Sequence, residues 1–224
     1  MLLLGVDTSG PGGSLALCRV EASAFEVLEV VSLTGGTYSA QLIPNLSALL
    51  ARHHRSRLDL DAFAVASGPG SFTGLRVGLS SVKALAEVLR KPIAAVSVLE
   101  AAAATCDKPG KVVAALDAGR KQVYVGEYEV ETGRTRRISE SLLTLDEFAA
   151  VAASYGTVQV VTPDLSVADA LRGVPSQLIA RPRADAYARL GLAKILTGET
   201  ISPEELDANY IRRSDAEIFA KPSS

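Results

Sequence analysis

The sequence has no tryptophan, only two cysteines and two histidines, and no excess of positive charge. Cys18 and Cys106 lie in no metal-binding spacing, so we expect two reduced thiols. His53 and His54 are adjacent, and neighbouring side chains leave a helix on different sides, so they do not form a pair of metal ligands. These shortages argue against a disulfide-rich secreted protein and predict that the chain binds no metal ion.

A basic surface for nucleic acid and a membrane segment are also lacking. The formal net charge is -2, whereas proteins that hold RNA unaided usually carry a basic excess. Three short basic clusters, at 53–57, 134–137 and 212–213, are interpreted as solvated loops and helix ends, which leaves an assisting contact with tRNA open. No run approaches the ~20 apolar residues of a membrane helix, and the first residues lack the basic flank of a signal peptide. We therefore expect a cytoplasmic protein without a membrane segment.

Small and aliphatic residues are abundant, as is typical of tightly layered α/β proteins. Short apolar runs predict strands and apolar residues at helical spacing predict helices. Ser97 is expected to cap a short helix, with Glu100 completing a capping box. The predicted strands are 2–6, 14–20, 25–33, 62–66, 92–96, 112–116, 122–130, 157–161 and 177–180, and the predicted helices are 39–52, 75–89, 97–105, 145–154 and 184–196.

An internal repeat follows from the pattern strand, Asp, turn, strand, which occurs at Asp7 and again at Asp117. The best break between the two copies is the Asp-Lys-Pro-Gly segment at 107–110. Two such halves favour an actin-like α/β fold of two lobes with mixed sheets, in which the Asp-bearing hairpins face each other across a cleft. We expect an N-terminal lobe at 1–106 and a C-terminal lobe at 107–224.

The turn after the first strand has parts suited to a phosphate or Mg²⁺ contact. Asp7 supplies a carboxylate, Thr8 and Ser9 supply hydroxyls, and the glycines that follow expose backbone amides. The alternative is that Asp7 and Thr8 satisfy the turn's own backbone. Both interpretations stay open at the level of sequence.

The segment Gly-Pro-Gly-Ser-Phe-Thr-Gly at 68–74 joins a buried strand to a helix. Gly68 and Gly70 allow a tight turn and a close approach to another backbone, and the helix start could bind an anion. The spacing matches neither a Walker loop nor a dinucleotide-binding fingerprint. A purely structural turn is the alternative.

Three stretches together resemble the TsaB (YeaZ) family. They are 4–9 with 14–17, then 68–78 running on to Lys91-Pro92, then 115–120 with Val123-Tyr124, supported by Tyr-Ile-Arg-Arg at 210–213 and Ala-Glu at 216–217. The resemblance implies an actin-like fold whose last ~20 residues pack back on the first lobe. It also implies a partner that pairs with TsaD, joined by the small ATPase TsaE, in modifying adenosine 37 of tRNAs that read codons beginning with A.

The resemblance stops short of the catalytic relative. TsaD, the larger paralogue once described as a glycoprotease, carries a His-x-x-x-His metal pair where this chain has Val98 and Ala102. The family comparison therefore implies an accessory, non-catalytic chain that holds no tight cofactor, with ATP and a metal on partner proteins. In that case Asp7, Thr8, Ser9, Gly68, Gly70 and Asp117 are vestigial phosphate-loop positions. TsaB proteins often have His-Ser before the first helix, where this chain has Tyr38-Ser39.

Two other functions compete with the accessory role. A stand-alone actin-like ATPase or small-molecule kinase would use Asp7 and Asp117 to hold Mg²⁺ and phosphate. A metalloprotease would need ligands that the sequence lacks.

The helices at 39–52 and 75–89 carry more apolar and small residues than one buried face needs, which predicts an interface with TsaD or with a second copy of the chain. Burial of these residues inside their own lobe is the alternative. The predicted interface residues are Leu42, Asn45, Leu46, Leu75, Arg76, Leu79 and Val82.

Overall fold

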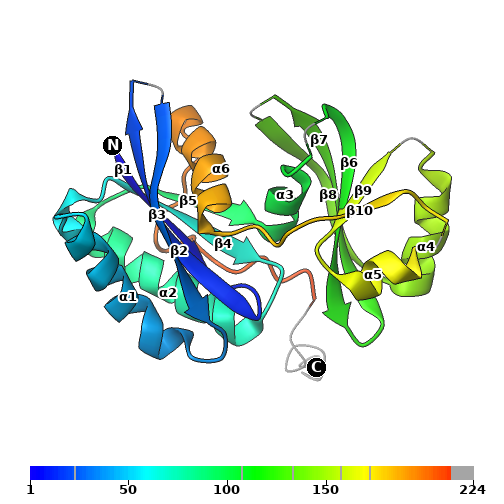
Figure 1. Cartoon of the computed structure of the whole chain (residues 1–224), viewed down its shortest axis with the longest axis horizontal. Helices are drawn as coiled ribbons and strands as arrows, with labels where there is room; N and C mark the ends of the chain where they lie inside the picture. Colours follow the sequence, from blue (N-terminus) through cyan, green and yellow to red (C-terminus); the bar gives the residue numbers. More distant parts are fainter. Residues whose placement is uncertain (23, 107, 133, 157, 172, 213–224) are drawn as a thin grey trace, which may run out of the picture.

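The computed structural model describes residues 1–22, 24–106, 108–132, 134–156, 158–171 and 173–212. The chain forms two lobes side by side (Figure 1). The first half contains β1 (Leu2–Asp7), β2 (Gly12–Glu21), β3 (Ala24–Thr34), α1 (Tyr38–Arg52), the 3₁₀ turn η1 (Arg57–Asp59), β4 (Ala62–Gly68), α2 (Phe72–Leu89), β5 (Ile93–Ser97) and α3 (Val98–Ala103). The second half contains β6 (Gly110–Gly119), β7 (Gln122–Glu131), β8 (Arg134–Thr144), α4 (Leu145–Ser154), β9 (Gln159–Thr162), α5 (Leu165–Ala170), β10 (Ser176–Leu178) and α6 (Ala184–Thr197).

The two sheets have the same strand order. The first runs β3-β2-β1-β4-β5 and the second runs β8-β7-β6-β9-β10. In each, the first strand of the half is antiparallel to the second and parallel to the fourth. The predicted mixed sheets and the internal repeat are therefore confirmed.

Burial explains why the central strands read as continuous apolar runs. Every residue of β1 and β4 is buried, because helices cover both faces of the first sheet. On one face α1 and α2 pack side by side over the strands, with Leu42, Leu49 and Leu79 in the core they share with β1 and β4. Figure 1 shows both helices below the first sheet and α6 on its other side.

Each half gives its last helix to the other half's sheet. Helix α6, from the second half, packs on β1, β2, β4 and β5, with Ala184 and Ala188 beside Gly5 and Gly191 beside Ala64. Helix α3, from the first half, puts Leu99 and Ala102 into the core of β6 and β7. This exchange joins the two lobes through apolar packing. The predicted boundary between residues 106 and 107 separates the two sheets but not the helices that cover them, and it stays a prediction.

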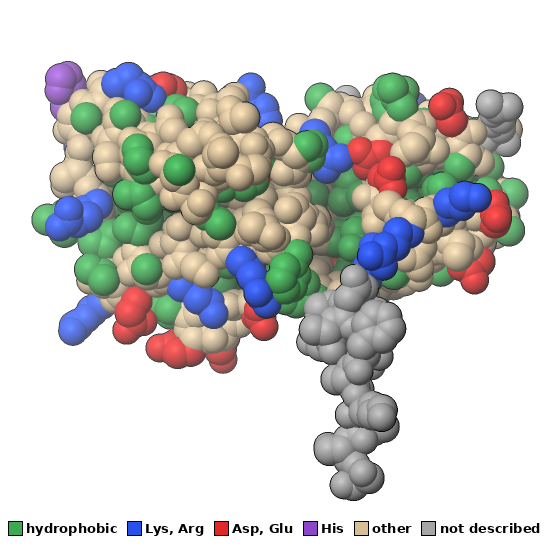
Figure 2. Space-filling view, turned by 90° about the horizontal axis from the view of Figure 1, so that it is seen from below, with side chains coloured by type: hydrophobic (Ala, Val, Ile, Leu, Met, Phe, Trp, Pro, Cys, Tyr) green, Lys and Arg blue, Asp and Glu red, His purple; other side chains and the backbone are tan. Residues whose placement is uncertain are grey.

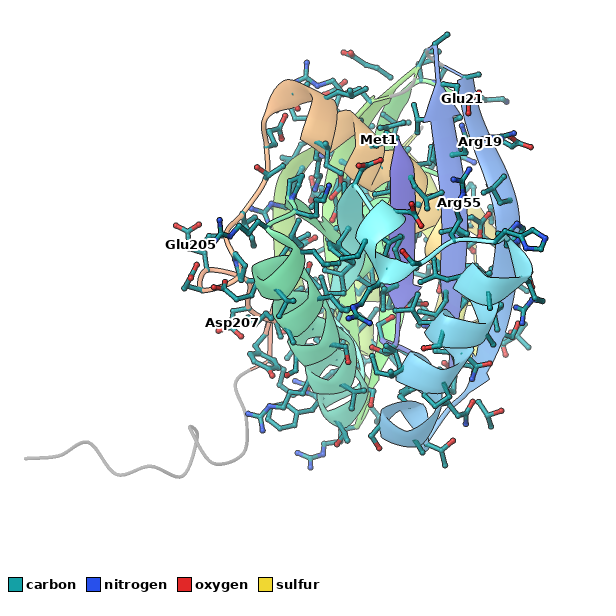
Figure 3. All side chains as sticks on the ribbon, turned by 90° about the vertical axis from the view of Figure 1, so that its left-hand side faces the viewer. Met1, Arg19, Glu21, Arg55, Glu205 and Asp207 are labelled. Carbon is teal, nitrogen blue, oxygen red and sulfur yellow. The ribbon has the colours of Figure 1, made fainter. Side chains whose placement is uncertain are left out.

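The chain after α6 returns to the first lobe. Ile201 forms a bridge to Ile93, Leu206 is fully buried in the first core, and the Asn209 amide donates to the Ser67 carbonyl at 2.7 Å. Figure 3 shows the segment that carries Glu205 and Asp207 beside α2. The rest of the expected C-terminal tail, 213–224, lies outside the described residues.

Several local predictions were wrong. Strand β8 and helix α5 were missed, so the basic cluster at 134–137 lies on an edge strand and not in a loop. Helix α2 begins at Phe72, earlier than expected, and β6 runs past Asp117 to Gly119. Ser97 does cap α3 by accepting from the Leu99 amide, but the Glu100 carboxylate binds Lys194 Nζ at 2.7 Å and forms no capping box.

Candidate functional site

A cleft of about 1090 Å³ lies between the lobes. Its walls come from the β1–β2 turn, the starts of α1 and α2, the β6–β7 hairpin, the segment before α6 and the chain after α6. Among the residues that line it are Ser9, Gly10, Gly70, Ser71, Arg76, Asp117, Arg120, Tyr124, Arg181, Tyr210 and Arg212.

The carboxylate and hydroxyls of the β1–β2 turn form hydrogen bonds within the turn and with α2. Asp7 is buried, and its Oδ1 accepts from the Ser9 amide at 2.9 Å and from the Ser9 hydroxyl at 2.7 Å. Burial raises the pKa of the Asp7 carboxyl, and the hydrogen bonds from Ser9 and the charge of Arg181 oppose that rise. The Thr8 hydroxyl donates to the Gly74 carbonyl at 2.8 Å. The polar side chains of Asp7 and Thr8 therefore have hydrogen-bond partners inside the protein, and neither residue lines the cleft.

The glycine segment brings α2 into contact with this turn. Gly68 has a φ of +111°, and a Cβ on Gly70 would lie 2.3 Å from the Ser9 carbonyl oxygen. The Ser71 amide donates to that same oxygen at 2.7 Å, while the Ser71 hydroxyl accepts from the Gly74 amide and caps the helix. Gly68 and Gly70 therefore allow the start of α2 to pack closely against neighbouring backbone, which agrees with a structural role for this turn.

Asp117 stands on the opposite wall and is exposed. Its carboxylate accepts from the Gly119 amide at 2.7 Å and from the Ser166 hydroxyl at 2.9 Å. Of the six predicted phosphate-loop positions, Ser9, Gly70 and Asp117 line the cleft, and Asp7, Thr8 and Gly68 do not.

Sequence reasoning did not place arginines in the cleft: Arg76 was predicted at a partner interface and Arg212 in a solvated basic cluster. Arg181 forms an ion pair with Asp164 at 2.6 Å, and Arg212 donates to the Gly119 carbonyl and the Gln122 side chain. The Arg76 guanidinium carbon lies 3.8 Å from the centre of the Phe72 ring. No spacing in the sequence connects these residues, because they come from distant segments that only the fold brings together.

The predicted interface on α1 and α2 needs correction. Leu42, Leu46, Leu75, Leu79 and Val82 are buried in the first core, so the prediction that they face a partner was wrong and the alternative, burial inside their own lobe, holds for them. Their helical stripe faces the sheet. Asn45 is half-buried and Arg76 is exposed.

Other side chains of α1 and α2 face outward. Ile43 is 47% exposed and Val88 is 77% exposed. We define the α1–α2 face as Ile43, Ser47, Ala48, Ser80, Ala84 and Val88, all of which are exposed. Figure 2 looks at this side of the first lobe, where apolar and uncharged side chains occupy the middle and charged ones gather toward the edge.

Comparison with known proteins gives the family. The profile of TsaD, tRNA N6-adenosine threonylcarbamoyltransferase, matches residues 32–162, which is more than half of the chain. The chain belongs to this family. It is 34% identical over 139 residues to the tRNA threonylcarbamoyladenosine biosynthesis protein TsaB of Bacillus subtilis, covering 62% of this chain and 59% of that protein. It is 26% identical over 236 residues to the Escherichia coli TsaB, covering 96% of each.

Solved structures agree with the sequence comparison. YeaZ from Pseudomonas aeruginosa is 26% identical, with a TM-score of 0.78, covering 93% of this chain and 99% of that one. The predicted resemblance to TsaB and YeaZ and the actin-like fold are thus confirmed. The chain spans about three fifths of the length of several curated relatives that it matches, including the B. subtilis protein.

Positions that differ from family patterns have clear structural roles. Val98 and Ala102, where the catalytic paralogue has metal-binding histidines, are buried in the core between α3 and the second sheet. Within the described ranges, no group of three His, Cys, Asp or Glu side chains could hold a metal ion. The Tyr38 hydroxyl donates to the Gly10 carbonyl at 2.8 Å and fixes the start of α1 to the β1–β2 turn.

Among the residues that the structure describes, no helix is long and apolar enough to cross a membrane.

Proposed function

We propose that this chain is a non-catalytic partner of a TsaD protein in forming the threonylcarbamoyl group on adenosine 37 of tRNAs that read codons beginning with A. The relatives named TsaB support the pathway. The observation that carries the accessory role is the pair Val98 and Ala102, whose buried aliphatic side chains replace the paralogue's metal ligands. TsaE is the expected third member, tRNA contact is expected through the complex, and the expected location is the cytoplasm.

ATP and the metal are expected on the partner proteins, and this chain is expected to hold no tight cofactor. The carboxylates of Asp7 and Asp117 support this, because both accept hydrogen bonds from their own turns and Asp7 is buried. A stand-alone ATPase or kinase would need Mg²⁺-dependent ATP turnover by the isolated chain. Linear release of phosphate that depends on the enzyme concentration would favour that alternative.

The surface proposed for TsaD is the α1–α2 face. Its exposed residues are small or apolar, which permits close approach of partner helices. TsaD has the same family architecture, so a like pair of helices is the fitting occupant, and a second copy of this chain would use the same face. None of the six side chains of the face is charged, so contact through them would bury no charge of this chain.

The test replaces outward residues and leaves the core intact. Ile43→Arg and Val88→Arg are each expected to weaken TsaD binding at least about 100-fold, since an unpaired charge buried at an interface costs several kcal/mol. Leu165→Arg is the matched control, because Leu165 is 66% exposed on α5 of the other lobe. Affinity is measured by calorimetry after circular dichroism confirms that each variant is folded.

Three results are informative. Loss of binding in both variants but not in the control supports the interface. Parent-like TsaD affinity in folded Ile43→Arg and Val88→Arg contradicts it. If the parent itself does not associate with its own TsaD, the accessory function is wrong, and sedimentation then tests whether the face pairs two copies of this chain.

A further inference from the structure

Strand β8 forms an open edge of the second sheet. It stands last in the strand order of that sheet, and among the described residues its backbone pairs with β7 and with no other strand. No helix or loop of the described chain shares a backbone hydrogen bond with residues 134–143. The outer side of such a strand presents unpaired N–H and C=O groups, on which an additional strand can form a ladder.

Charges alternate across the second sheet and end at this edge with arginines. Lys111 of β6 lies opposite Glu129 of β7, and Glu129 lies opposite Arg136 of β8. Two residues farther along, Glu131 of β7 lies opposite Arg134 of β8. Residues directly opposite each other have side chains on the same face, and opposite charges there stabilise the sheet. An acidic side chain on the strand beyond β8 would therefore continue the alternation.

The two arginines are exposed at the edge. The Arg136 side chain is 62% exposed and donates one hydrogen bond to Glu129 at 3.3 Å. A guanidinium has five N–H donors in a fixed planar arrangement, so this contact leaves donors for a carboxylate on the open side.

The same charges select the strand that can pair there. A second β8 laid antiparallel would bring the basic segment 134–137 against its own copy, and like charges opposite each other destabilise a sheet. The neighbouring Glu129 and Glu131 disfavour RNA, because they would repel its phosphates. An acidic strand meets neither penalty, and specificity often depends on such repulsion of the wrong partners.

A groove follows the same edge on the other face of the sheet. It has a volume of about 750 Å³ and lies between residues 134–137 and helix α6, which contributes Leu190 and Leu196. Leu196 is 72% exposed. A second hollow of about 450 Å³ shares Arg134, Thr135 and Leu190 with the first, so the depression extends toward the start of β8. A strand added to β8 would place every second side chain over this depression.

The charges in the groove favour apolar side chains there. Lys194 and Glu100, which both line it, form an ion pair with each other at 2.7 Å. Glu199 and Asp207 are exposed on the wall opposite β8 and would repel a carboxylate. The two faces of an added strand therefore meet different surroundings, arginines on one and leucines with acidic residues on the other.

We infer that the β8 edge is a docking site for an extended acidic segment of a partner protein, which adds a strand to the second sheet. Acidic side chains of the segment lie beside Arg134 and Arg136, and the apolar side chains between them enter the groove over α6. The backbone ladder supplies affinity and the alternate side chains supply specificity. The inference does not depend on the TsaD partner proposed above, because no residue of the α1–α2 face lines either hollow.

The test titrates the full-length chain into a labelled, end-capped peptide of alternating glutamate and valine, about eight residues long like an ordinary strand, and follows fluorescence anisotropy at pH 7. Saturable binding with a Kd below about 1 mM is expected. Arg134→Glu/Arg136→Glu is expected to weaken binding at least about tenfold, because two cross-strand pairs change from attraction to repulsion. The same variant is expected to bind the matching peptide of lysine and valine more tightly than the parent does.

The matched control is Arg55→Glu/Arg57→Glu. Both arginines are exposed in the first lobe, and the double substitution changes the net charge by the same amount. Parent-like affinity for the acidic peptide is expected of this control. Circular dichroism and thermal melting without peptide check that each variant is folded.

A second arm separates strand addition from charge attraction. Two further peptides of the same sequence carry N-methyl groups on the backbone, one at the glutamates and the other at the valines. The amides on one side of a strand belong to alternate residues, so only one of the two peptides loses its ladder with β8. That peptide is expected to bind at least about tenfold more weakly than the unmodified one, since several hydrogen bonds are lost.

Loss of binding in the charge-reversed variant and in one methylated peptide, with the control unchanged, supports the site. The inference is overturned if the parent shows no saturable binding, if both methylated peptides bind like the unmodified one, or if the folded charge-reversed variant binds like the parent. It is also overturned if a short single-stranded RNA displaces the peptide as well as unlabelled peptide does, or if sedimentation shows that the parent self-associates through this edge and the charge-reversed variant does not.

Discussion

Glu140 connects both lobes and the C-terminal segment through one buried carboxylate, of which 5% of the side chain is exposed. Its Oε1 accepts from the Ser97 hydroxyl of β5 at 2.5 Å and from the Tyr128 hydroxyl of β7. Its Oε2 accepts from the Asn209 side chain at 2.6 Å. Burial first, and then the charge of Glu140, raises the pKa of Tyr128, so its hydroxyl is a donor at neutral pH. Removing Glu140 tests how firmly the lobes are joined.

The expected cost of Glu140→Ala follows from these contacts. A hydrogen bond to a charged group contributes about 1.5–3 kcal/mol, and a buried donor left without its acceptor adds a penalty of similar size. Water entering the vacated space offsets part of this, and the three contacts are not additive. We expect the free energy of unfolding to fall by about 3–5 kcal/mol. For a chain of this size that lowers Tm by roughly 10 °C.

Urea unfolding followed by circular dichroism measures the effect. Glu129→Ala is the matched control on the neighbouring strand β7, where Glu129 makes an exposed ion pair with Arg136 at 3.3 Å that contributes at most about 1 kcal/mol. The reasoning is refuted if Glu140→Ala costs no more than the control. Glu140→Gln keeps the shape of the side chain but has one acceptor oxygen fewer. Its loss in the free energy of unfolding is expected to lie between those of Glu140→Ala and Glu129→Ala.

Three further outcomes are expected. Gly74→Ala places a Cβ 2.1 Å from the Thr8 carbonyl oxygen and is expected to lower the free energy of unfolding by about 1–3 kcal/mol in denaturant titrations, despite the better helix propensity of alanine. Burial raises the pKa of Asp7 in the folded chain, so the parent loses folding free energy as the pH rises from 3.8, the ordinary value, through the folded-state pKa. Asp7→Asn has no such titration and is expected to be more stable than the parent at pH 7 in urea titrations. Burial, and then the charge of Asp185, raises the pKa of Cys18 to about 12, so in a Cys106→Ser background Ellman's reagent at pH 8 is expected to label the chain only after unfolding.

Regular periodicity made most of the fold predictable from the sequence. The buried strands and the long helices carry clear apolar patterns, and the repeated Asp gave the equivalence of the two halves. Strand β8 was missed because it is an edge strand whose segment Arg134–Arg137 is polar on both faces, so no alternation marks it. Helix α5 has six residues, too few for a helical period to be visible.

The site was predictable only in part, for a physical reason. The hairpin turn after Asp7 was located correctly, and the one after Asp117 lies within three residues of its predicted place, because local sequence sets a hairpin. Whether Asp7 faces the cleft depends on how α2 packs over it, which local sequence does not fix. The same holds for Leu42 and Leu79: an apolar stripe gives a buried face but does not say whether a partner or the chain's own sheet buries it.

The two halves share a topology but differ in what their outer helices can do. In the first lobe α1 and α2 have 15 and 18 residues and lie side by side over the sheet, whereas their counterparts α4 and α5 have 10 and 6. At 1.5 Å per residue, α1 and α2 are about 22 and 27 Å long and α4 and α5 about 15 and 9 Å long, so only the first pair offers a long two-helix face to a partner. Helices α3 and α6 each pack on the sheet of the other half and so join the two lobes. A partner docked on α1 and α2 would therefore be held in a fixed orientation relative to both lobes and to the cleft between them.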